Sequence, residues 1–180
     1  MLDSYLEILE EGYYEIGFAF DGLADHNVWK RPADGLLSIG EIAGHVAYWQ
    51  AVRLTGEGGH ATQERESPTD IPVPNLDKCR VKSPLIDHRF SYYTTNLTTP
   101  PSEEHLSMTA KQVCDELLRV HRESVAYFKS INPGLESHPP GWPPRYTFHA
   151  FLTYMAFHVA YHTGQIYSAR HLLGENAPDN

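Results

Sequence analysis

The chain has 180 residues, of which 14 are Lys or Arg and 23 are Asp or Glu, giving a net charge of −9. This length suits a single domain over residues 1–180, and 41% hydrophobic with 21% charged residues is typical of a soluble globular protein. The acidic balance argues against broad electrostatic attraction to nucleic-acid phosphates or anionic membranes, so we expect neither as a partner.

The two cysteines, Cys79 and Cys114, form no CxxC pair and fit reduced thiols better than a disulfide framework. The N-terminal segment carries early acidic residues and lacks a basic start followed by an apolar core, so we expect no signal peptide. No stretch approaches the ~20 apolar residues that span a bilayer. These features together predict a cytoplasmic protein.

The first predicted element is a long amphipathic helix over about residues 2–24. Its apolar residues step alternately by four and three, as in a helix packed at a shallow angle in a bundle: Leu2, Leu6, Leu9, Tyr13, Ile16, Phe20 and Leu23. Gly12 and Gly17 lower its intrinsic helix propensity, so packing must stabilise it. We expect it to end near Asp25.

The second predicted helix covers about residues 38–55 and begins with a capping-box pattern, Ser38 followed three residues later by Glu41. One face of this helix carries Ile42, His45, Trp49 and Val52. Because His45 lies on this apolar stripe, we expect its ring to face the interior. Gly44 costs roughly 1 kcal/mol of helix propensity relative to Ala, which indicates a close approach to another segment.

Residues of about 56–107 show no helical periodicity and include six prolines. Connections longer than about 15 residues are usually functional or disordered, and the aromatic residues here argue against plain disorder. We therefore interpret this stretch as an ordered crossover packed across the bundle. Residues 90–95, with the sequence FSYYTT, form a strand-like run within it.

Two more amphipathic helices are predicted over about residues 108–131 and 147–173. Asn132-Pro133-Gly134 closes the earlier one, and Gly174 suits the position just after the end of the later one. Four amphipathic helices with a long crossover between the second and the third predict an all-α fold, a four-helix bundle.

A pair of histidines stands out in the last predicted helix. His158 and His162 lie four residues apart, and side chains at that spacing project from the same helix face one turn apart. The same stripe holds Phe151, Met155, Ile166 and Ala169. Since no Asp or Glu occurs between Pro143 and Gly174, the helix supplies no carboxylate to these rings, and a divalent cation would pair with both.

With 11 histidines in the chain, such a pair by itself is more often core or surface than ligand. His45 changes this balance, because it offers a third nitrogen from a different buried stripe, and bundles often build metal sites from facing helices. Three protein ligands with one open position are the arrangement of catalytic rather than structural zinc.

At this point the sequence resembles the DinB/YfiT-like metal-binding four-helix-bundle family. The segment SIGEIAGHVAYW looks like the family's second-helix segment with its single His, and FHVAYHTGQI is similar to the fourth-helix HxxxHxGQ pattern. The resemblance implies a divalent metal, often nickel or zinc, held by a triad that maps onto His45, His158 and His162. Family members with assigned activity include thiol-dependent transferases and isomerases that use low-molecular-weight thiols.

The chain departs from the family pattern in two places. Thr163 stands where a basic residue commonly follows the last His, which puts a substrate anion contact in doubt. The connection over residues 56–107 is longer than usual, which would reshape the mouth of a pocket. The family tendency and the tyrosine-rich segments favour a homodimer, although the sequence names no interface.

Several neighbouring enzyme classes are excluded by missing residues. Val159 stands where an HExxH metalloprotease carries its general base, and the chain has neither a GxxxxGK[ST] phosphate loop nor a GxSxG elbow. Gln165, one turn from His162, either orients a ligand or bound water, or serves helix packing or solvent. Gly164 is expected to permit a close helix contact.

Some aromatic side chains are candidates for a pocket lining or for ordinary core: Tyr48, Trp49, His149 and Tyr161. The remaining histidines lack a converging pattern and are expected on the surface or in loops: His26, His60, His88, His105, His121, His138 and His171.

The leading hypothesis is a metal-dependent enzyme acting on a small molecule, of the thiol-dependent S-transferase or isomerase type or of the hydrolase type. Zinc lowers the pKa of a bound water from ~15.7 to ~7, which would create a nucleophile at neutral pH, but the sequence identifies no general base. The alternative is a non-catalytic binding or stress-response protein in which the metal is structural. A haem carrier would need axial ligands on opposite sides of a porphyrin.

Overall fold

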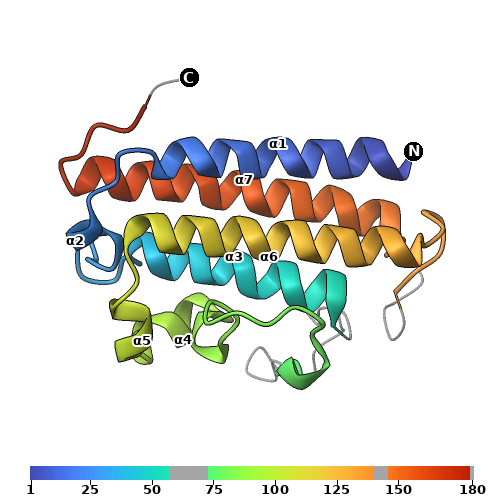
Figure 1. The fold of residues 1–180 in the computed structure, drawn as a ribbon, viewed down its shortest axis with the longest axis horizontal. Helices are drawn as coiled ribbons and strands as arrows, with labels where there is room; N and C mark the ends of the chain where they lie inside the picture. Colours follow the sequence, from blue (N-terminus) through green and yellow to red (C-terminus); the bar gives the residue numbers. More distant parts are fainter. Residues whose placement is uncertain (57–72, 140–145, 179–180) are drawn as a thin grey trace.

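The structure is a computed structural model that describes residues 1–56, 73–139 and 146–178. In this described part the chain is helical and contains no strand. Four long helices dominate it (Figure 1): α1 (Leu2–Phe20), α3 (Ile39–Thr55), α6 (Ala110–Ile131) and α7 (Phe148–Leu172). The short helical segments are α2 (Asp25–Val28), η1 (Leu76–Lys78), η2 (His88–Phe90), α4 (Tyr93–Thr98) and α5 (Glu103–Leu106).

The four long helices form a bundle in which α1 and α7 run in one direction and α3 and α6 in the other (Figure 1). Helix α3 packs against α6 and α7, and α1 packs against the same two helices. The predicted all-α four-helix bundle with a long crossover between its second and third long helices is therefore confirmed. Antiparallel α3 and α7 face each other, which places the predicted histidine ligands on adjacent helices.

The predicted helix bounds agree with the structure at most ends and are wrong at one. Helix α1 ends at Phe20 rather than near residue 24, because Asp21 is extended and Gly22 adopts a positive φ of 69°. A separate short helix, α2, then follows. Asn132 closes α6 in the left-handed conformation, and Gly174 follows α7 with a φ of 80°, as their sequences indicate.

The predicted capping box of α3 is present. The Ser38 hydroxyl accepts from the Glu41 N–H, and the Glu41 carboxylate accepts from the Ser38 N–H at 2.8 Å. Arg31 donates to the buried Glu41 carboxylate at 2.5 Å. This helix start is thus fixed by side chains on both sides, and it sets the position of His45 two turns along.

The crossover is ordered over its described residues 73–107 and packs along α3, as expected. Its strand-like run was a wrong interpretation, because Phe90 ends η2 and Tyr93–Thr98 form α4. With no neighbouring strand among the described residues, the backbone of this run bonds locally: Asn96 N–H donates to Tyr92 C=O at 2.9 Å. The crossover thereby presents the backbone of Phe90 and Ser91 to α3.

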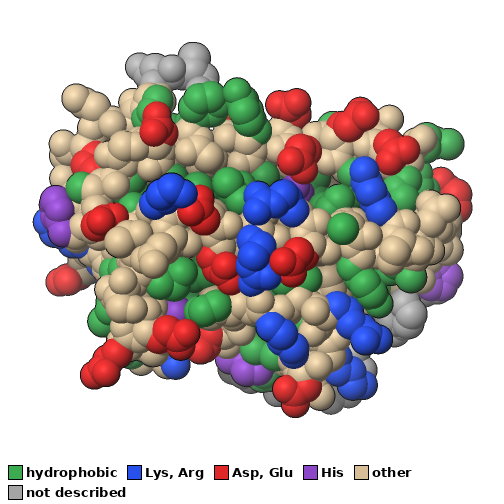
Figure 2. All heavy atoms as spheres, in the orientation of Figure 1, with side chains coloured by type: hydrophobic (Ala, Val, Ile, Leu, Met, Phe, Trp, Pro, Cys, Tyr) green, Lys and Arg blue, Asp and Glu red, His purple; other side chains and the backbone are tan. Residues whose placement is uncertain are grey.

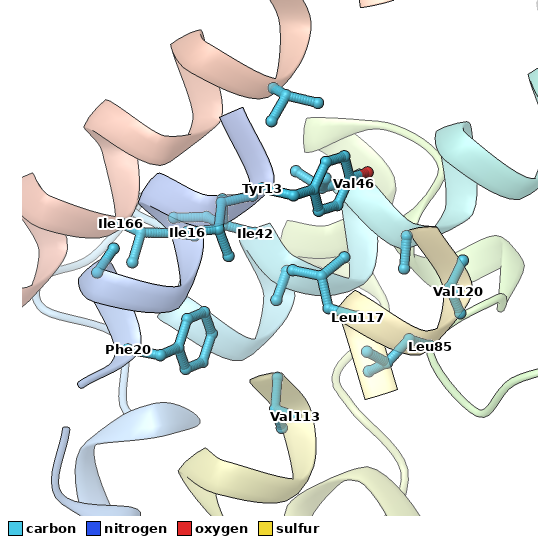
Figure 3. Packing of buried hydrophobic residues seen from close by; sticks show 14 of the residues in the cluster. Tyr13, Ile16, Phe20, Ile42, Val46, Leu85, Val113, Leu117, Val120 and Ile166 are labelled. Atoms are coloured by element: carbon cyan, nitrogen blue, oxygen red, sulfur yellow. The ribbon is translucent and has the colours of Figure 1, made fainter. Parts of the chain in front are cut away.

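The core lies between the long helices and extends under the crossover. Figure 3 shows residues of α1, α3, α6 and α7 pointing toward a common interior, with Leu85 of the crossover at its edge. The face in Figure 2 carries acidic and basic side chains interspersed over the surface. Across the described residues, no helix is both long enough and apolar enough to cross a membrane.

Candidate metal centre

Three histidines from two helices converge at the α3–α7 seam. His45 comes from α3, and His158 and His162 come from successive turns of α7. The ring centroid of His45 lies 5.2 Å from that of His158 and 4.6 Å from that of His162, and the latter two rings are 4.4 Å apart. His158 is buried, while His45 and His162 are half-buried. The sequence-predicted triad is thus brought together in space.

One nitrogen from each ring lies within 4.8 Å of the other two. The Nε2 atoms of His45 and His158 are 3.3 Å apart. With nitrogens ~2.1 Å from a tetrahedral zinc, two ligand nitrogens lie about 3.4 Å apart, so this pair already has the separation of two ligands to one ion. Within the described part of the chain, the group includes no fourth His, Cys, Asp or Glu.

The crossover fixes the tautomer of His45. Its Nδ1–H donates to the backbone carbonyl of Phe90 at 2.9 Å, which leaves the Nε2 lone pair directed toward His158. Gly44 permits this contact, because a Cβ at that position would lie 2.6 Å from the Phe90 ring. The close approach predicted at Gly44 is therefore confirmed, and it serves the site.

Gln165 fixes the tautomer of His162 in the same way. Its side-chain carbonyl accepts from His162 Nδ1–H at 2.7 Å, while its amide donates to the Tyr161 hydroxyl at 3.1 Å. The second bond orients the Gln165 amide, so that its oxygen faces the imidazole. Two of the three rings are consequently held from behind by carbonyl acceptors, which is how metal-ligating imidazoles are usually positioned.

The three imidazoles are neutral at physiological pH. Burial lowers the pKa of His45 to about 3, with a further contribution from His162. Burial also lowers the pKa of His162 to about 4 and that of His158 further still, and the nearby Arg53 guanidinium acts in the same direction on both. Since a metal binds the neutral imidazole, the lone pairs are available without displacing protons. The buried Nδ1 of His158 has no hydrogen-bond partner among the described residues.

Two cavities meet at the triad. One of about 280 Å³ is lined by the three histidines together with Arg53 and aromatic side chains. Another of about 260 Å³ shares His45, Tyr161 and His162 and continues to Gln165. A larger hollow of about 820 Å³ lies over α1 and α6, but none of the triad lines it. In that hollow His121 is engaged by Glu10 at 2.7 Å and by Gln50 at 3.2 Å, so its ring nitrogens are already bonded.

The donor set fits a divalent cation. Three neutral imidazoles with converging lone pairs suit zinc or nickel, and the absence of a fourth protein ligand among the described residues leaves coordination positions open. No carboxylate lines either cavity in the described part of the chain, so a bound cation would keep its full charge in this site.

Arg53 is the residue at this site that sequence reasoning missed. It lies two turns after His45 on α3, and its side chain is 7% exposed and lines the cavity of about 280 Å³. Its Cζ lies 4.5 Å from the Trp49 ring centroid and 4.8 Å from that of Tyr154. The spacing His45, Trp49, Arg53 was the available signal, since residues at i, i+4 and i+8 share one helix face.

The family model of the DinB superfamily matches residues 9–166, which is more than half of the 180-residue chain. The chain belongs to the DinB superfamily. Comparison of this DinB superfamily member with curated proteins and with solved structures gave no match. The matched range includes all three histidines and most of the four long helices.

The departure at Thr163 has a structural explanation in this DinB superfamily protein. Thr163 is buried, and its hydroxyl donates to the Val159 carbonyl at 2.8 Å, so it lines neither cavity at the triad. The positive charge beside the triad comes instead from Arg53 on α3.

Of the other residues singled out in the sequence, some line the cavity at the triad and others do not. Trp49 and Tyr161 line the cavity with Arg53, whereas Tyr48 belongs to the core and His149 is exposed on α7. Gly164 was expected to permit a close helix contact, but nothing among the described residues would meet a Cβ there within 4 Å. That interpretation is wrong, because the face of α7 that carries Gly164 is exposed.

Two of the remaining histidines are not on the surface as expected. His105 is buried, and both of its ring nitrogens are hydrogen-bonded. Nε2 bonds to the Pro84 carbonyl at 2.8 Å, and Nδ1 bonds to the Ser102 hydroxyl at 2.7 Å. His121 is buried against Tyr13. His60 lies outside the described residues.

Proposed function

We propose that this DinB superfamily protein is a divalent-metal-dependent enzyme acting on a small molecule, with zinc or nickel held by His45, His158 and His162. The single observation that carries the proposal is the convergence of three neutral imidazole nitrogens within 4.8 Å, with no fourth protein ligand in the group among the described residues. A closed structural zinc site usually completes four protein ligands, so a three-ligand site supports catalysis.

A divalent cation in this position would supply Lewis acidity toward whatever occupies its open position. The chain's own residues have defined parts. The Phe90 carbonyl and the Gln165 side chain hold two imidazoles in the ligating tautomer, and aromatic side chains form much of the cavity wall beside them. The two cavities that share His45 and His162 provide room for two small reactants beside the triad.

The lining favours thiol chemistry over hydrolysis. Neither cavity at the triad is lined by a described Asp or Glu, and the three histidines would be ligands, so among the described residues the activation of a water molecule would depend on the metal alone. A thiol needs less activation than water, because its ordinary pKa of about 8.5 is much closer to neutrality than the value of ~15.7 for free water. We therefore propose an S-transferase or isomerase that uses a low-molecular-weight thiol.

The thiol would come from outside the chain. Cys79 and Cys114 line neither cavity at the triad. Burial raises the pKa of Cys79, and burial raises the pKa of Cys114 to about 11, so both are poor nucleophiles at neutral pH. Both are free rather than disulfide-bonded, which fits a reducing, cytoplasmic environment.

The rival function is a non-catalytic binding or stress-response protein in which the metal braces α3 against α7. The two hypotheses predict different effects of the metal on the stability of the protein and on its reactivity. A bracing metal should raise the free energy of unfolding strongly and leave thiol conjugation at the uncatalysed rate. A catalytic metal should be needed for turnover.

Elemental analysis of the purified protein tests the site itself. We expect one divalent metal per chain in the wild type and near-complete loss in His45→Ala, His158→Ala and His162→Ala. His171→Ala, which removes an exposed histidine on α7, is the matched control and should retain the metal. Full metal content in any of the three triad variants would sink the assignment. A visible spectrum without a Soret band would separately dispose of a haem carrier.

A screen of the metal-loaded protein then tests the reaction class. It should compare conjugation of low-molecular-weight thiols to electrophilic substrates with hydrolysis of ester and amide substrates. Metal-dependent conjugation that is lost in His158→Ala supports the transferase proposal. Hydrolysis without conjugation would overturn the thiol assignment.

A further inference from the structure

Arg53 is a buried cation that has no carboxylate partner among the described residues. Within the described part of the chain, its guanidinium Nε has no hydrogen-bond partner, and Nη1 donates to the Met155 sulfur at 3.6 Å. Among the described residues it forms no ion pair, and its other contacts are with aromatic side chains, including a side-chain hydrogen bond with Tyr154. An unpaired buried charge is costly, and natural proteins usually satisfy an arginine with an acceptor.

The aromatic contacts occupy the faces of the guanidinium, and Tyr154 and Met155 bond to part of its edge, which leaves Nε without a partner among the described residues. Trp49 and Tyr154 lie with ring centroids 4.5 and 4.8 Å from Cζ, one from α3 and the other from α7. Such cation–π contacts stabilise the charge and hold the plane of the group. The five N–H donors of a guanidinium lie in its plane, and two parallel ones can pair with the two oxygens of a carboxylate.

The cavity around Arg53 has a positive and apolar lining. Its described walls include no Asp or Glu, although the chain as a whole has a net charge of −9. Exposed Phe157 and Tyr161 form the outer wall, with ring centroids 6.2 Å apart. A divalent cation on the triad would add charge of the same sign, so an anionic ligand would balance both centres.

We propose that this cavity binds a small organic acid, with Arg53 pairing its carboxylate and the aromatic walls covering its apolar body. The inference rests on the proposed function, because it takes the site to be catalytic. It adds the substrate class, which is an electrophile that carries a carboxylate. A carboxylate fits better than a phosphate dianion, because one guanidinium supplies one positive charge and one bidentate fork. A volume of about 280 Å³ suits an acid the size of benzoate.

Arg53 is a binding residue in this proposal and takes no part in bond making. It would anchor the substrate near the triad, since His158 and Arg53 line the same cavity and the Tyr154 ring lies 4.8 Å from Arg53 Cζ and 5.9 Å from the His158 ring. The same anchoring selects anionic over neutral substrates, because a neutral analogue leaves the guanidinium edge unpaired.

Calorimetric titration with benzoate tests the proposal, with benzamide as the neutral ligand of the same shape. We expect benzoate to bind the wild-type chain at least about ten-fold more tightly than benzamide, in both the zinc-loaded and the EDTA-treated protein. Arg53→Met should remove this preference, and Arg53→Lys should retain only part of it, because lysine lacks the bidentate fork. Arg119→Gln is the matched control, since Arg119 pairs with Glu116 and Glu123 on α6 and does not line the cavity, so that benzoate binding should be unchanged.

The outcomes separate this inference from the metal assignment. Equal affinity for benzoate and benzamide in the wild type would overturn it, whatever the variants do, and so would unchanged benzoate affinity in folded Arg53→Met. Inorganic phosphate that displaces benzoate at a comparable concentration would overturn the carboxylate assignment. An Arg53-dependent preference in a chain that holds no metal would leave the acid site standing while the proposed function fails. If Arg53→Met has normal metal content but no longer prefers benzoate to benzamide, the result supports both the metal assignment and the acid site.

Discussion

His162 donates from Nδ1 to the side-chain oxygen of Gln165 across 2.7 Å, a bond between residues three positions apart on α7. The bond decides which ring nitrogen of His162 carries the proton and so directs the Nε2 lone pair toward His45 and His158. The Tyr161 hydroxyl in turn accepts a hydrogen bond from the Gln165 side-chain amide. The ligating geometry of this histidine is therefore set by its own helix.

Gln165→Leu should weaken metal binding while preserving the fold. The change removes the acceptor of His162 Nδ1–H, and loss of such a contact typically costs about 10- to 100-fold in metal affinity. Competition against a chelating indicator dye measures this effect. Tyr161→Phe, which removes only the partner of the Gln165 amide, should cost much less. Equal affinities for wild type and Gln165→Leu would refute the orienting role.

Gly44→Ala and Gly164→Ala should have opposite effects on stability. A Cβ at position 44 would lie 2.6 Å from the Phe90 ring, so the crossover must shift, and such overpacking costs about 1–3 kcal/mol. At position 164 nothing described would meet the Cβ within 4 Å, and Ala should gain roughly 0.5–1 kcal/mol from helix propensity.

Urea unfolding of both glycine variants measures the difference. Because Phe90 also accepts from His45, Gly44→Ala should in addition weaken metal binding, whereas Gly164→Ala should not. A stable Gly44→Ala variant with wild-type metal affinity would show that the crossover does not position His45.

The sequence predicted the bundle well because its helices carry strong local signals. The Ser38–Glu41 capping box and the Asn132 and Gly174 stops are short-range features, and all lie where they were expected. The end of α1 was predicted too late, because Gly22 takes a positive φ that the apolar stripe does not reveal. The strand-like run in the crossover was misinterpreted because aromatic and threonine-rich composition is compatible with a short helix capped by tertiary contacts.

Some residues of the site could be predicted from local sequence patterns, and others depend on contacts between distant segments. His158 and His162 could be paired from their spacing, and His45 from its place on another apolar stripe. The Phe90 carbonyl could not be predicted, since a backbone atom in an aperiodic crossover has no sequence signature. Arg53 was overlooked because a charged residue late in a helix is usually solvated, and its burial here depends on tertiary packing, in which Tyr154 of α7 lies against its guanidinium.

Ser38→Ala should destabilise the protein by about 1 kcal/mol, the usual cost of losing an N-cap side chain. The Ser38 hydroxyl accepts from the Glu41 N–H and also contacts its buried carboxylate at 2.8 Å, so the variant leaves a buried group with one partner fewer. Urea unfolding measures the loss. Ser130→Ala, at an exposed position on α6, is the control and should change the free energy of unfolding by less than about 0.5 kcal/mol.

The triad should make the metal-free protein less stable in mild acid. Burial lowers the folded-state pKa of His45 to about 3 and that of His162 to about 4, both below the ordinary value of about 6.5 in the unfolded chain. As the pH falls below about 6.5, the unfolded state binds protons that the folded state refuses, so the free energy of unfolding decreases. Above about pH 7 both states are neutral at these rings, and the contribution is constant.

The expected slope is roughly 1 kcal/mol per pH unit for each such histidine between about pH 6 and pH 4.5. Urea unfolding in EDTA at several pH values measures it. In His162→Gln the free energy of unfolding should fall with decreasing pH less steeply, by the slope that one histidine contributes. His171→Gln, at an exposed position on α7, should show the same pH dependence as the wild type. Carboxylates that titrate in the same range cancel in the difference between wild type and variant. Parallel profiles for wild type and His162→Gln would mean that the His162 ring accepts a proton in the folded state as easily as in the unfolded chain.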